Sequence, residues 1–213
     1  MAYLIKEIFR SLQGEGMNAG RPAVFLRFSG CNLWSGRAED RSNAPCPFCD
    51  TDFVGTDGPG GGAYGTATDV AVAMAALLPS PAFRDARPLA VVTGGEPALQ
   101  LDTRLVEELH LCGWEVAVET NGTLPLPRGI DWVTVSPKAG TRLVVTAGDE
   151  LKLLYPQPGL DPASLEDLAF RHFILQPIDN SRLAENIRLA IDYCLTHPRW
   201  RLGIQMHKML KIK

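Results

Sequence analysis

The chain contains seven short runs of hydrophobic residues, most of them rich in Val, Ile, Leu or Phe. In most of these runs both odd and even positions are apolar, which is the pattern of strands covered on both faces of a sheet. We therefore predict strands at Val24–Phe28, Leu89–Val92, Val116–Val118, Trp132–Val135, Leu151–Tyr155, Phe173–Gln176 and Leu202–Met206.

Helical patterns lie between some of the predicted strands. Thr68 or Asp69 can cap the first helix, Asp102 can cap the second, and Gly113 ends the second. The predicted helices are Val70–Leu78, Thr103–Cys112, a short Ser164–Ala169 and the longer Ser181–His197. The longest of them has an apolar side, which we expect to face the core, made of Leu183, Ile187, Ala190, Ile191 and Cys194.

Alternating strands and helices predict a parallel sheet with right-handed crossovers. Two connections, 121–131 and 136–150, are rich in Pro and Gly and do not hold a full helix. A complete eight-fold barrel needs about 250 residues, more than the 213 present here. The predicted fold is α/β: one domain over residues 1–213, forming an incomplete, TIM-like barrel of six or seven mostly parallel strands with about three main outer helices.

Composition narrows the classes of function. The chain has 21 Lys and Arg against 24 Asp and Glu, a formal net charge of −3, which argues against a nucleic-acid partner. No apolar run approaches the roughly 18 residues of a membrane-spanning helix. The first residues lack the basic stretch and cleavage site of a secretory signal, so we expect a cytoplasmic protein without a membrane partner.

Three of the five cysteines, Cys31, Cys46 and Cys49, lie close together in the chain, while Cys112 and Cys194 stand alone on predicted helices, where we expect them buried. The two-residue spacing of Cys46 and Cys49 suits two thiolates on one metal or cluster, but also a redox dithiol or half of a zinc site. A structural zinc site needs four protein ligands, and a dithiol leaves Cys31 unexplained. Three thiolates on a four-iron cluster would leave one iron open for chemistry.

Polar residues follow five of the predicted strands, and catalytic groups of parallel α/β barrels gather at those strand ends. The five segments are Thr93-Gly94-Gly95-Glu96-Pro97, Glu119-Thr120-Asn121-Gly122, Ser136-Pro137-Lys138, Pro177-Ile178-Asp179 and His207-Lys208. We expect these polar groups to converge on one rim.

The three cysteines after the first predicted strand, with Gly94-Gly95-Glu96-Pro97 after a later one, resemble the radical S-adenosylmethionine superfamily. Fourteen residues separate Cys31 from Cys46, where three are usual, and this spacing is similar to one branch of the 7-carboxy-7-deazaguanine synthases. The likeness runs nearly end to end through Leu12-Gln13-Gly14-Glu15-Gly16, Cys31-Asn32-Leu33-Trp34, Cys49-Asp50-Thr51-Asp52-Phe53, Glu119-Thr120-Asn121-Gly122, Ser136-Pro137-Lys138, Gln176-Pro177 and Gln205-Met206-His207-Lys208.

The resemblance implies a radical ring contraction of 6-carboxy-5,6,7,8-tetrahydropterin to 7-carboxy-7-deazaguanine, with loss of ammonia, on the way to queuosine and related 7-deazapurines. It implies one 4Fe-4S cluster per chain, S-adenosylmethionine and Mg²⁺ as cofactors. The cofactors carry the chemistry, so no side chain is assigned as catalytic. A flavodoxin or ferredoxin as reductant and a homodimer are further expectations from the family.

The resemblance also implies site residues. The cluster ligands are Cys31, Cys46 and Cys49. The contacts with S-adenosylmethionine are Phe48, Cys49, Asp50, Gly94, Gly95, Ser136, Pro137, Lys138, Gln176, Pro177, Ile178 and Asp179. The contacts with substrate are Leu12, Gln13, Gly14, Glu15, Arg27, Thr93 and His207. Thr51 supplies an oxygen ligand to Mg²⁺.

Several of these residues keep a plainer interpretation. Phe48 and His207 could be ordinary core residues, and Glu96 could hold the rim in place. Arg27 sits within a buried strand and needs an anion, which could be the substrate carboxylate or a neighbouring Glu or Asp. Without the resemblance, Thr51 and its neighbours would be interpreted as a turn or helix cap.

Two alternatives remain, and one further motif match is set aside. A glycyl-radical activase has a similar size, but it would leave Arg27 and Gln13-Gly14-Glu15 without a purpose. A zinc-stabilised binding module would contain zinc and no iron. The segment 60–65 matches the dinucleotide pattern G-x-G-x-x-G, but no buried strand precedes it, so we predict a mobile loop near the cluster.

Overall fold

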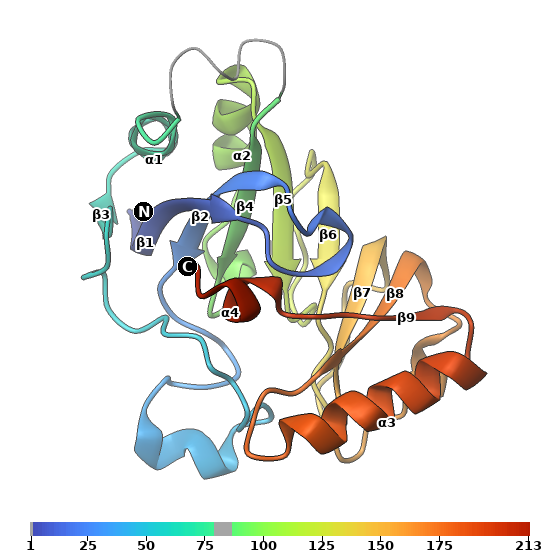
Figure 1. Ribbon diagram of the computed structural model, residues 1–213. Helices are drawn as coiled ribbons and strands as arrows, with labels where there is room; N and C mark the ends of the chain where they lie inside the picture. Colours follow the sequence, from blue (N-terminus) through green and yellow to red (C-terminus); the bar gives the residue numbers. More distant parts are fainter. Residues whose placement is uncertain (1, 79–86) are drawn as a thin grey trace.

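The computed structural model describes residues 2–78 and 87–213, and their strands form one nine-stranded sheet in the order β3-β1-β2-β4-β5-β6-β7-β8-β9 (Figure 1). Seven neighbouring strands are parallel, and the sheet does not close, because β3 and β9 remain its edges. The parallel strands are β2 (Pro22–Phe28), β4 (Leu89–Gly94), β5 (Glu115–Thr120), β6 (Trp132–Val135), β7 (Ala147–Tyr155), β8 (Ala169–Pro177) and β9 (Trp200–Leu202). The prediction of an incomplete, mostly parallel barrel is confirmed.

Two strands at the start of the sheet were missed. β1 (Tyr3–Leu12) pairs antiparallel with β2, and β3 (Gly62–Tyr64) pairs antiparallel with β1. Lys6 and Glu7 interrupt the apolar pattern of β1, yet both are buried. The glycine-rich segment predicted as a mobile loop forms β3 instead, and a Cβ on Gly61 would lie 2.4 Å from the Lys6 carbonyl oxygen. Glycines there allow the chain to run close against β1.

Three main helices accompany the sheet: α1 (Ala67–Ala75), α2 (Thr103–Leu111) and α3 (Leu183–Thr196). The Asp102 cap of α2 is confirmed, since its side chain accepts a hydrogen bond from the Leu105 amide. The cap of α1 is Thr66 rather than Thr68 or Asp69, because Thr66 and Asp69 form a reciprocal capping box. A fourth helix, α4 (Met206–Leu210), follows β9 near the C-terminus.

Four short 3-10 helices complete the elements: η1 (Gly16–Asn18), η2 (Ala38–Asn43), η3 (Pro97–Leu99) and η4 (Pro162–Leu165). The predicted helix Ser164–Ala169 is wrong, because only η4 forms there, capped by Asp161, and β8 begins at Ala169. The predicted strand Leu202–Met206 is also wrong. Pairing with β8 stops at Gly203, and the Met206 amide donates to the Gly14 carbonyl instead.

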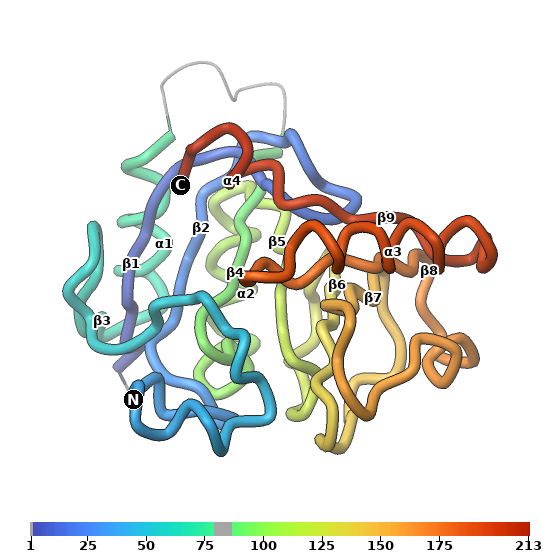
Figure 2. Tube along the Cα trace, turned by 60° about the horizontal axis from the view of Figure 1, so that its bottom comes forward, coloured from blue at the N-terminus to red at the C-terminus, as the bar shows by residue number. Residues whose placement is uncertain are grey.

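Helices α1, α2 and α3 lie on one face of the sheet, and the segment after β1 and helix α4 lie on the other. Side chains at even positions of β2, such as Val24 and Leu26, pack with α1 and α2, whereas α3 packs mainly on β8 and β9. Odd positions point the other way, where the segment after β1 and helix α4 lie (Figures 1 and 2). The predicted burial of the apolar side of α3 is only partly correct: Ala190 is buried, but Leu183, Ile187 and Ile191 are more than a third exposed.

No helix of the described part of the chain combines the length and the apolar character needed to cross a membrane.

Candidate active site

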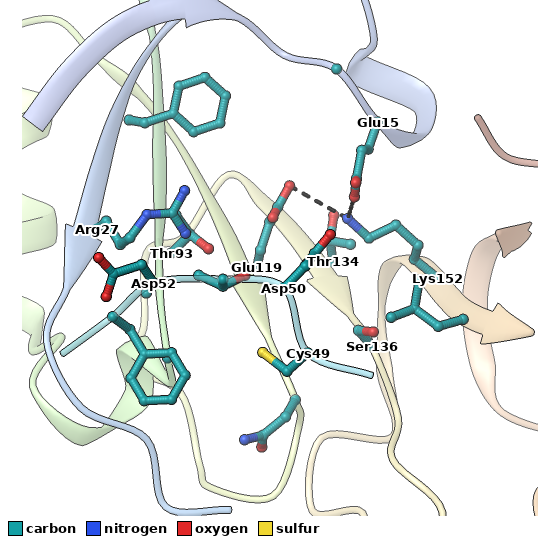
Figure 3. Close-up of a pocket in the computed structure, with 18 of the residues that line it drawn as sticks. Glu15, Arg27, Cys49, Asp50, Asp52, Thr93, Glu119, Thr134, Ser136 and Lys152 are labelled. Atoms are coloured by element: carbon teal, nitrogen blue, oxygen red, sulfur yellow. Dashed lines mark hydrogen bonds and ion pairs between the residues drawn. The ribbon is translucent and has the colours of Figure 1, made fainter. Parts of the chain in front are cut away.

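The sheet face opposite α1 and α2 contains a cavity of about 410 Å³. Its walls come from alternate residues of neighbouring strands, because side chains alternate between the two faces of a sheet. Strand register places Arg27 beside Thr93 and Glu119 beside Thr134. Small-molecule sites commonly have volumes of roughly 300–1,000 Å³. The cavity is therefore a candidate active site (Figure 3). Residues from four of the five predicted strand-end segments line it, whereas Pro177-Ile178-Asp179 does not.

Cys31, Cys46 and Cys49 all border this cavity. Burial raises the pKa of Cys31 and raises that of Cys46 to about 11. Among the described residues, no three His, Cys, Asp or Glu side chains are grouped closely enough to hold one metal ion. A four-iron cluster binds each thiolate to a different iron and so accepts more widely spaced thiols.

The segment between Cys31 and Cys46 supports the loop that contains the other two cysteines. Trp34 packs edge-to-face on Phe53, with ring centres 5.6 Å apart. The Arg41 guanidinium lies 4.3 Å from the centre of the Trp34 ring, and its Nη1 donates to the carbonyl oxygens of Pro47 and Cys49 at 2.9 and 2.8 Å. Arg41 thus fixes the backbone on both sides of Phe48.

The glycines after β4 let that strand end pack directly against the Cys31 segment. A Cβ on Gly95 would lie 2.3 Å from the Gly30 carbonyl oxygen and 2.7 Å from the Cys31 Cβ, and one on Gly94 would lie 2.5 Å from the Phe28 carbonyl oxygen. Any larger residue would push the first cysteine away from β4.

Glu96 has a structural role at the rim. Its buried carboxylate accepts hydrogen bonds from the Thr120 hydroxyl and the Asn121 amide, both at 2.7 Å, and from the Ala98 amide at 2.9 Å. Burial raises its pKa. These bonds tie the ends of β4 and β5 together, as the plainer interpretation of this residue proposed.

One side of the cavity is built around Lys152 of β7 (Figure 3). Its buried ammonium group lies 2.5 Å from a Glu15 carboxylate oxygen and 3.6 Å from one of Glu119. Gln205 Nε2 donates to Glu15 at 2.8 Å, and Gln13 Nε2 donates to Glu119 at 2.9 Å. This part of the cavity presents two carboxylates fixed by one shared cation.

The ionisation of this group follows from its contacts. Burial opposes the charged form of Glu15, but Lys152 outweighs it, helped by the amides of Gln205 and Gln176, and the pKa of Glu15 falls to about 2. Burial likewise opposes the charged form of Lys152, yet Glu119, Glu15 and Glu150 together raise its pKa. The ion pair stays charged across the physiological range.

The opposite side is formed by β1 and β2. Arg27 Nε donates to Glu7 at 2.9 Å, so the structural ion pair considered as an alternative is present. Within the described residues the Arg27 Nη groups have no hydrogen-bond partner, which leaves them available to an anion. Glu7 also pairs with Lys213, whose ammonium lies 4.6 Å from the centre of the Phe9 ring. The C-terminal segment therefore lies along β1 (Figure 2).

Two polar groups near the cysteines have unusual environments. Lys138 Nζ donates to the carbonyl and hydroxyl oxygens of Ser136, both at 2.7 Å, and burial lowers the pKa of Lys138 to about 8. Gln176 is only 1% exposed, and no described residue donates to its Oε1. That buried acceptor borders the cavity and fits a ligand that supplies an N–H or O–H group.

The structure brings most of the predicted residues to this cavity. Those on its lining are Leu12, Gln13, Gly14, Glu15, Arg27, Cys31, Cys46, Phe48, Cys49, Asp50, Thr51, Thr93, Gly94, Gly95, Ser136, Lys138, Gln176 and His207. Phe48 is half-buried rather than in the core, and it also borders a second, more open hollow of about 940 Å³ together with Ile178.

Three predicted residues border neither hollow. The Pro137 carbonyl accepts from the Gln157 amide, Pro177 is buried at the end of β8, and Asp179 pairs with Lys208. Cys112 is exposed and not buried as predicted, because it caps the solvent-facing end of α2, whereas Cys194 is half-buried.

Among the lining residues to which sequence reasoning gave no role, four make polar contacts that matter for the site: Glu119, Lys152, Gln205 and Lys208. Three of them stand in motifs already noted in the sequence. The signal for Lys152 was also available, since it lies between Leu151 and Leu153 in a predicted strand, as Arg27 lies between Leu26 and Phe28. A cation in such a position requires an anion.

Comparison with known proteins gives close relatives. No protein-family model matches the chain. The 7-carboxy-7-deazaguanine synthase of Nitratidesulfovibrio vulgaris is 60% identical over 215 residues, and that of Bradyrhizobium diazoefficiens is 56% identical over 213 residues; both alignments cover 100% of each chain. The crystal structure of QueE from Escherichia coli superposes with a TM-score of 0.69 at 30% identity, covering 97% of this chain and 95% of that one.

Proposed function

Because the chain belongs to the 7-carboxy-7-deazaguanine synthase family, we infer that it converts 6-carboxy-5,6,7,8-tetrahydropterin to 7-carboxy-7-deazaguanine with release of ammonia, a step of queuosine biosynthesis. The observation that carries this inference is one cavity with three cysteines at its rim, an available guanidinium on one side and paired carboxylates on the other. The substrate has the matching groups, namely an anionic carboxylate and a planar edge of N–H donors.

Cys31, Cys46 and Cys49 would hold a 4Fe-4S cluster, and S-adenosylmethionine would bind beside it. When bound, the cluster would supply an electron, and S-adenosylmethionine would supply the radical chemistry that removes a hydrogen atom from the substrate. The donor set supports this assignment: three thiols border one cavity, and the approach of Gly95 to Cys31 leaves room for no side chain between them.

Residues near the cysteines would bind different parts of S-adenosylmethionine. Gln176 Oε1, which lacks a donor, would accept from a ribose hydroxyl or the amino group. The Ser136–Lys138 pair would provide donors for the carboxylate of the methionine part. Phe48 stands between the two hollows and would pack against the adenine, with Ile178 on the other side.

The charges on the two sides orient the substrate. Arg27 would pair with the pterin carboxylate through its Nη groups, while its Nε stays on Glu7. Glu15 and Glu119, both paired with Lys152, would accept from the N–H groups of the opposite edge. Thr51 would supply one oxygen to a Mg²⁺ ion shared with the carboxylate, since Mg²⁺ takes few protein ligands. If the pterin bound in the opposite orientation, its carboxylate would lie beside the carboxylates of Glu15 and Glu119 and would be repelled.

An anaerobic product assay tests this function. The reconstituted protein, supplied with reductant, S-adenosylmethionine, Mg²⁺ and the pterin, should form 7-carboxy-7-deazaguanine. Cys46→Ala should lose iron and activity together, whereas Cys112→Ala should keep both, because Cys112 is exposed and distant from the cavity lining. Product formation by Cys46→Ala with full iron content would contradict the ligand assignment.

We also propose a homodimer, a flavodoxin or ferredoxin as electron donor, and a cytoplasmic location. The dimer is supported by α3, where Leu183, Ile187, Ile191 and Leu195 repeat at every fourth position and remain exposed. Leu195→Glu should shift the protein to monomer in analytical ultracentrifugation. Leu111→Glu on α2 is the matched control, because these leucines are 79% and 82% exposed. Equal masses for the two variants would exclude α3 as the interface.

A further inference from the structure

Lys208 of α4 joins three segments that lie far apart in the chain. Its ammonium nitrogen lies 2.5 Å from an Asp50 carboxylate oxygen and 2.8 Å from one of Asp179. Asp50 directly follows Cys49, and Asp179 follows β8. One side chain therefore connects the cysteine loop, the turn after β8 and the C-terminal helix at the edge of the cavity.

The residue before Lys208 contacts the other end of the cavity. A Cβ on Gly14 would lie 2.3 Å from His207 Nδ1, and the Gly14 carbonyl accepts from the Met206 amide at 2.8 Å. Helix α4 thus packs on the Gln13–Glu15 segment, where the substrate is proposed to bind. Neighbouring residues of one short helix contact the two halves of the site.

We propose that Lys208 is a positioning residue that orients Asp50 and Asp179 for S-adenosylmethionine. Through α4, Lys208 couples the binding of this cofactor to the binding of the substrate at the Gln13–Glu15 segment. The proposal rests on the proposed function, because the family resemblance assigns both aspartates to the cofactor; Asp50 lines the cavity, and Asp179 is connected to it through Lys208. Without the ammonium, two adjacent carboxylates would repel each other, and the Cys49–Thr51 segment would lose its tie to α4.

Removal of Lys208 should leave the fold intact. Its side chain is 33% exposed, and those of Asp50 and Asp179 are 55% and 36% exposed, a range in which ion pairs contribute little to overall stability. The effect should therefore be local. Lys211→Met is the matched control, because Lys211 is an exposed lysine at the end of the same helix and has no ion-pair partner among the described residues.

The first measurement needs no cofactor. Hydrogen–deuterium exchange of the cofactor-free protein should show faster exchange around residues 47–53 and 177–181 in Lys208→Met, and no change in Lys211→Met. Lys208→Arg should restore part of the protection, because it keeps the charge. Unchanged exchange in Lys208→Met would overturn the positioning role, whether or not the chain binds a cluster.

The second measurement is S-adenosylmethionine affinity of the reconstituted, unreduced protein by calorimetry, with and without the pterin. Lys208→Met should weaken binding about fivefold or more and abolish any gain produced by the pterin. Asp50→Asn should weaken it too, and the double variant should lose less affinity than the sum of the two single losses, because only the Asp179 part of the Lys208 effect remains in the Asp50→Asn background. Additive losses would refute action through Asp50. A wild-type protein without iron or S-adenosylmethionine binding would instead refute the proposed function.

Discussion

Replacing Lys152 by methionine tests the electrostatics of the cavity. The side chain is 6% exposed, and its ammonium group pairs with two carboxylates, Glu15 at 2.5 Å and Glu119 at 3.6 Å. Methionine keeps a similar length and volume, so the change removes the charge with little loss of packing. Glu15 is then left buried without a counter-charge.

The magnitude follows from the geometry. At the effective dielectric constant of about 20 suited to protein sites, unit charges 2.5 Å apart attract by about 6 to 7 kcal/mol, and desolvation cancels a large part of this. Removal of one partner of a buried pair usually costs about 3–5 kcal/mol. With total stabilities of about 5–15 kcal/mol, Lys152→Met should lose roughly a fifth or more of the free energy of unfolding at pH 7.

The loss should depend on pH. In the wild type the pKa of Glu15 is lowered to about 2, so its contribution is complete above its ordinary pKa near 4.3 and disappears only as the pH falls toward 2. Without Lys152, burial raises the pKa of Glu15, so the variant regains stability when Glu15 is protonated. The stability gap between the two proteins should narrow from pH 7 to pH 5.

Urea unfolding of the cofactor-free proteins, followed by circular dichroism, measures both effects. The Lys152→Met/Glu15→Gln double variant should be more stable than Lys152→Met at pH 7, because it removes the uncompensated charge. Lys211→Met controls for loss of a surface lysine. A Lys152→Met variant within 1 kcal/mol of the wild type, with the same gap at both pH values, would refute the reasoning.

Three further predictions follow from single contacts. Arg27→Ala should raise the pterin KM about tenfold or more in steady-state kinetics, with Arg27→Lys intermediate, because lysine lacks the bidentate geometry; an unchanged KM would remove the assignment. Thr51→Ala should raise the Mg²⁺ concentration needed for half-maximal activity, and an unaltered magnesium titration would count against Thr51. Tyr3→Phe should cost about 1–2 kcal/mol at neutral pH, because it removes the hydrogen bond to Asp102. Burial and that bond raise the pKa of Tyr3 to about 12. The contribution of Tyr3 to the free energy of unfolding is therefore fully present below pH 10 and is lost as the pH rises toward 12. Urea unfolding of Tyr3→Phe should not show this alkaline loss.

The parallel strands were predictable because most of their residues are apolar at odd and even positions alike. Helix α2 was predictable because Asp102 precedes it and Gly113 follows it. Errors arose where long-range contacts decide local structure. Gly203 and Met206 lie in an apolar run, but the run leaves the sheet because the Gly14 carbonyl accepts the Met206 amide. No local sequence pattern predicts that hydrogen bond.

The site was predicted largely through motifs, and the structure adds how its parts support one another. The three cysteines could be grouped by spacing, but the contribution of Arg41 to their loop depends on the path of the intervening segment. Likewise, the Gln205-Met206-His207-Lys208 motif was visible as a unit. That Lys208 contacts two aspartates, 158 and 29 residues away in the chain, was not.

The same charged residues explain why β1 was not predicted and why the cavity is polar. Arg27 and Lys152 are cations within buried strands, and each requires an anion nearby. Both anions come from the first fifteen residues: Glu7 for Arg27 and Glu15 for Lys152. Charged residues in that segment break the apolar pattern by which a buried strand is recognised, so β1 is hidden for the same reason that the cavity can hold its cations. A charged N-terminal segment beside strands with isolated central cations therefore predicts a strand that lines a polar cavity.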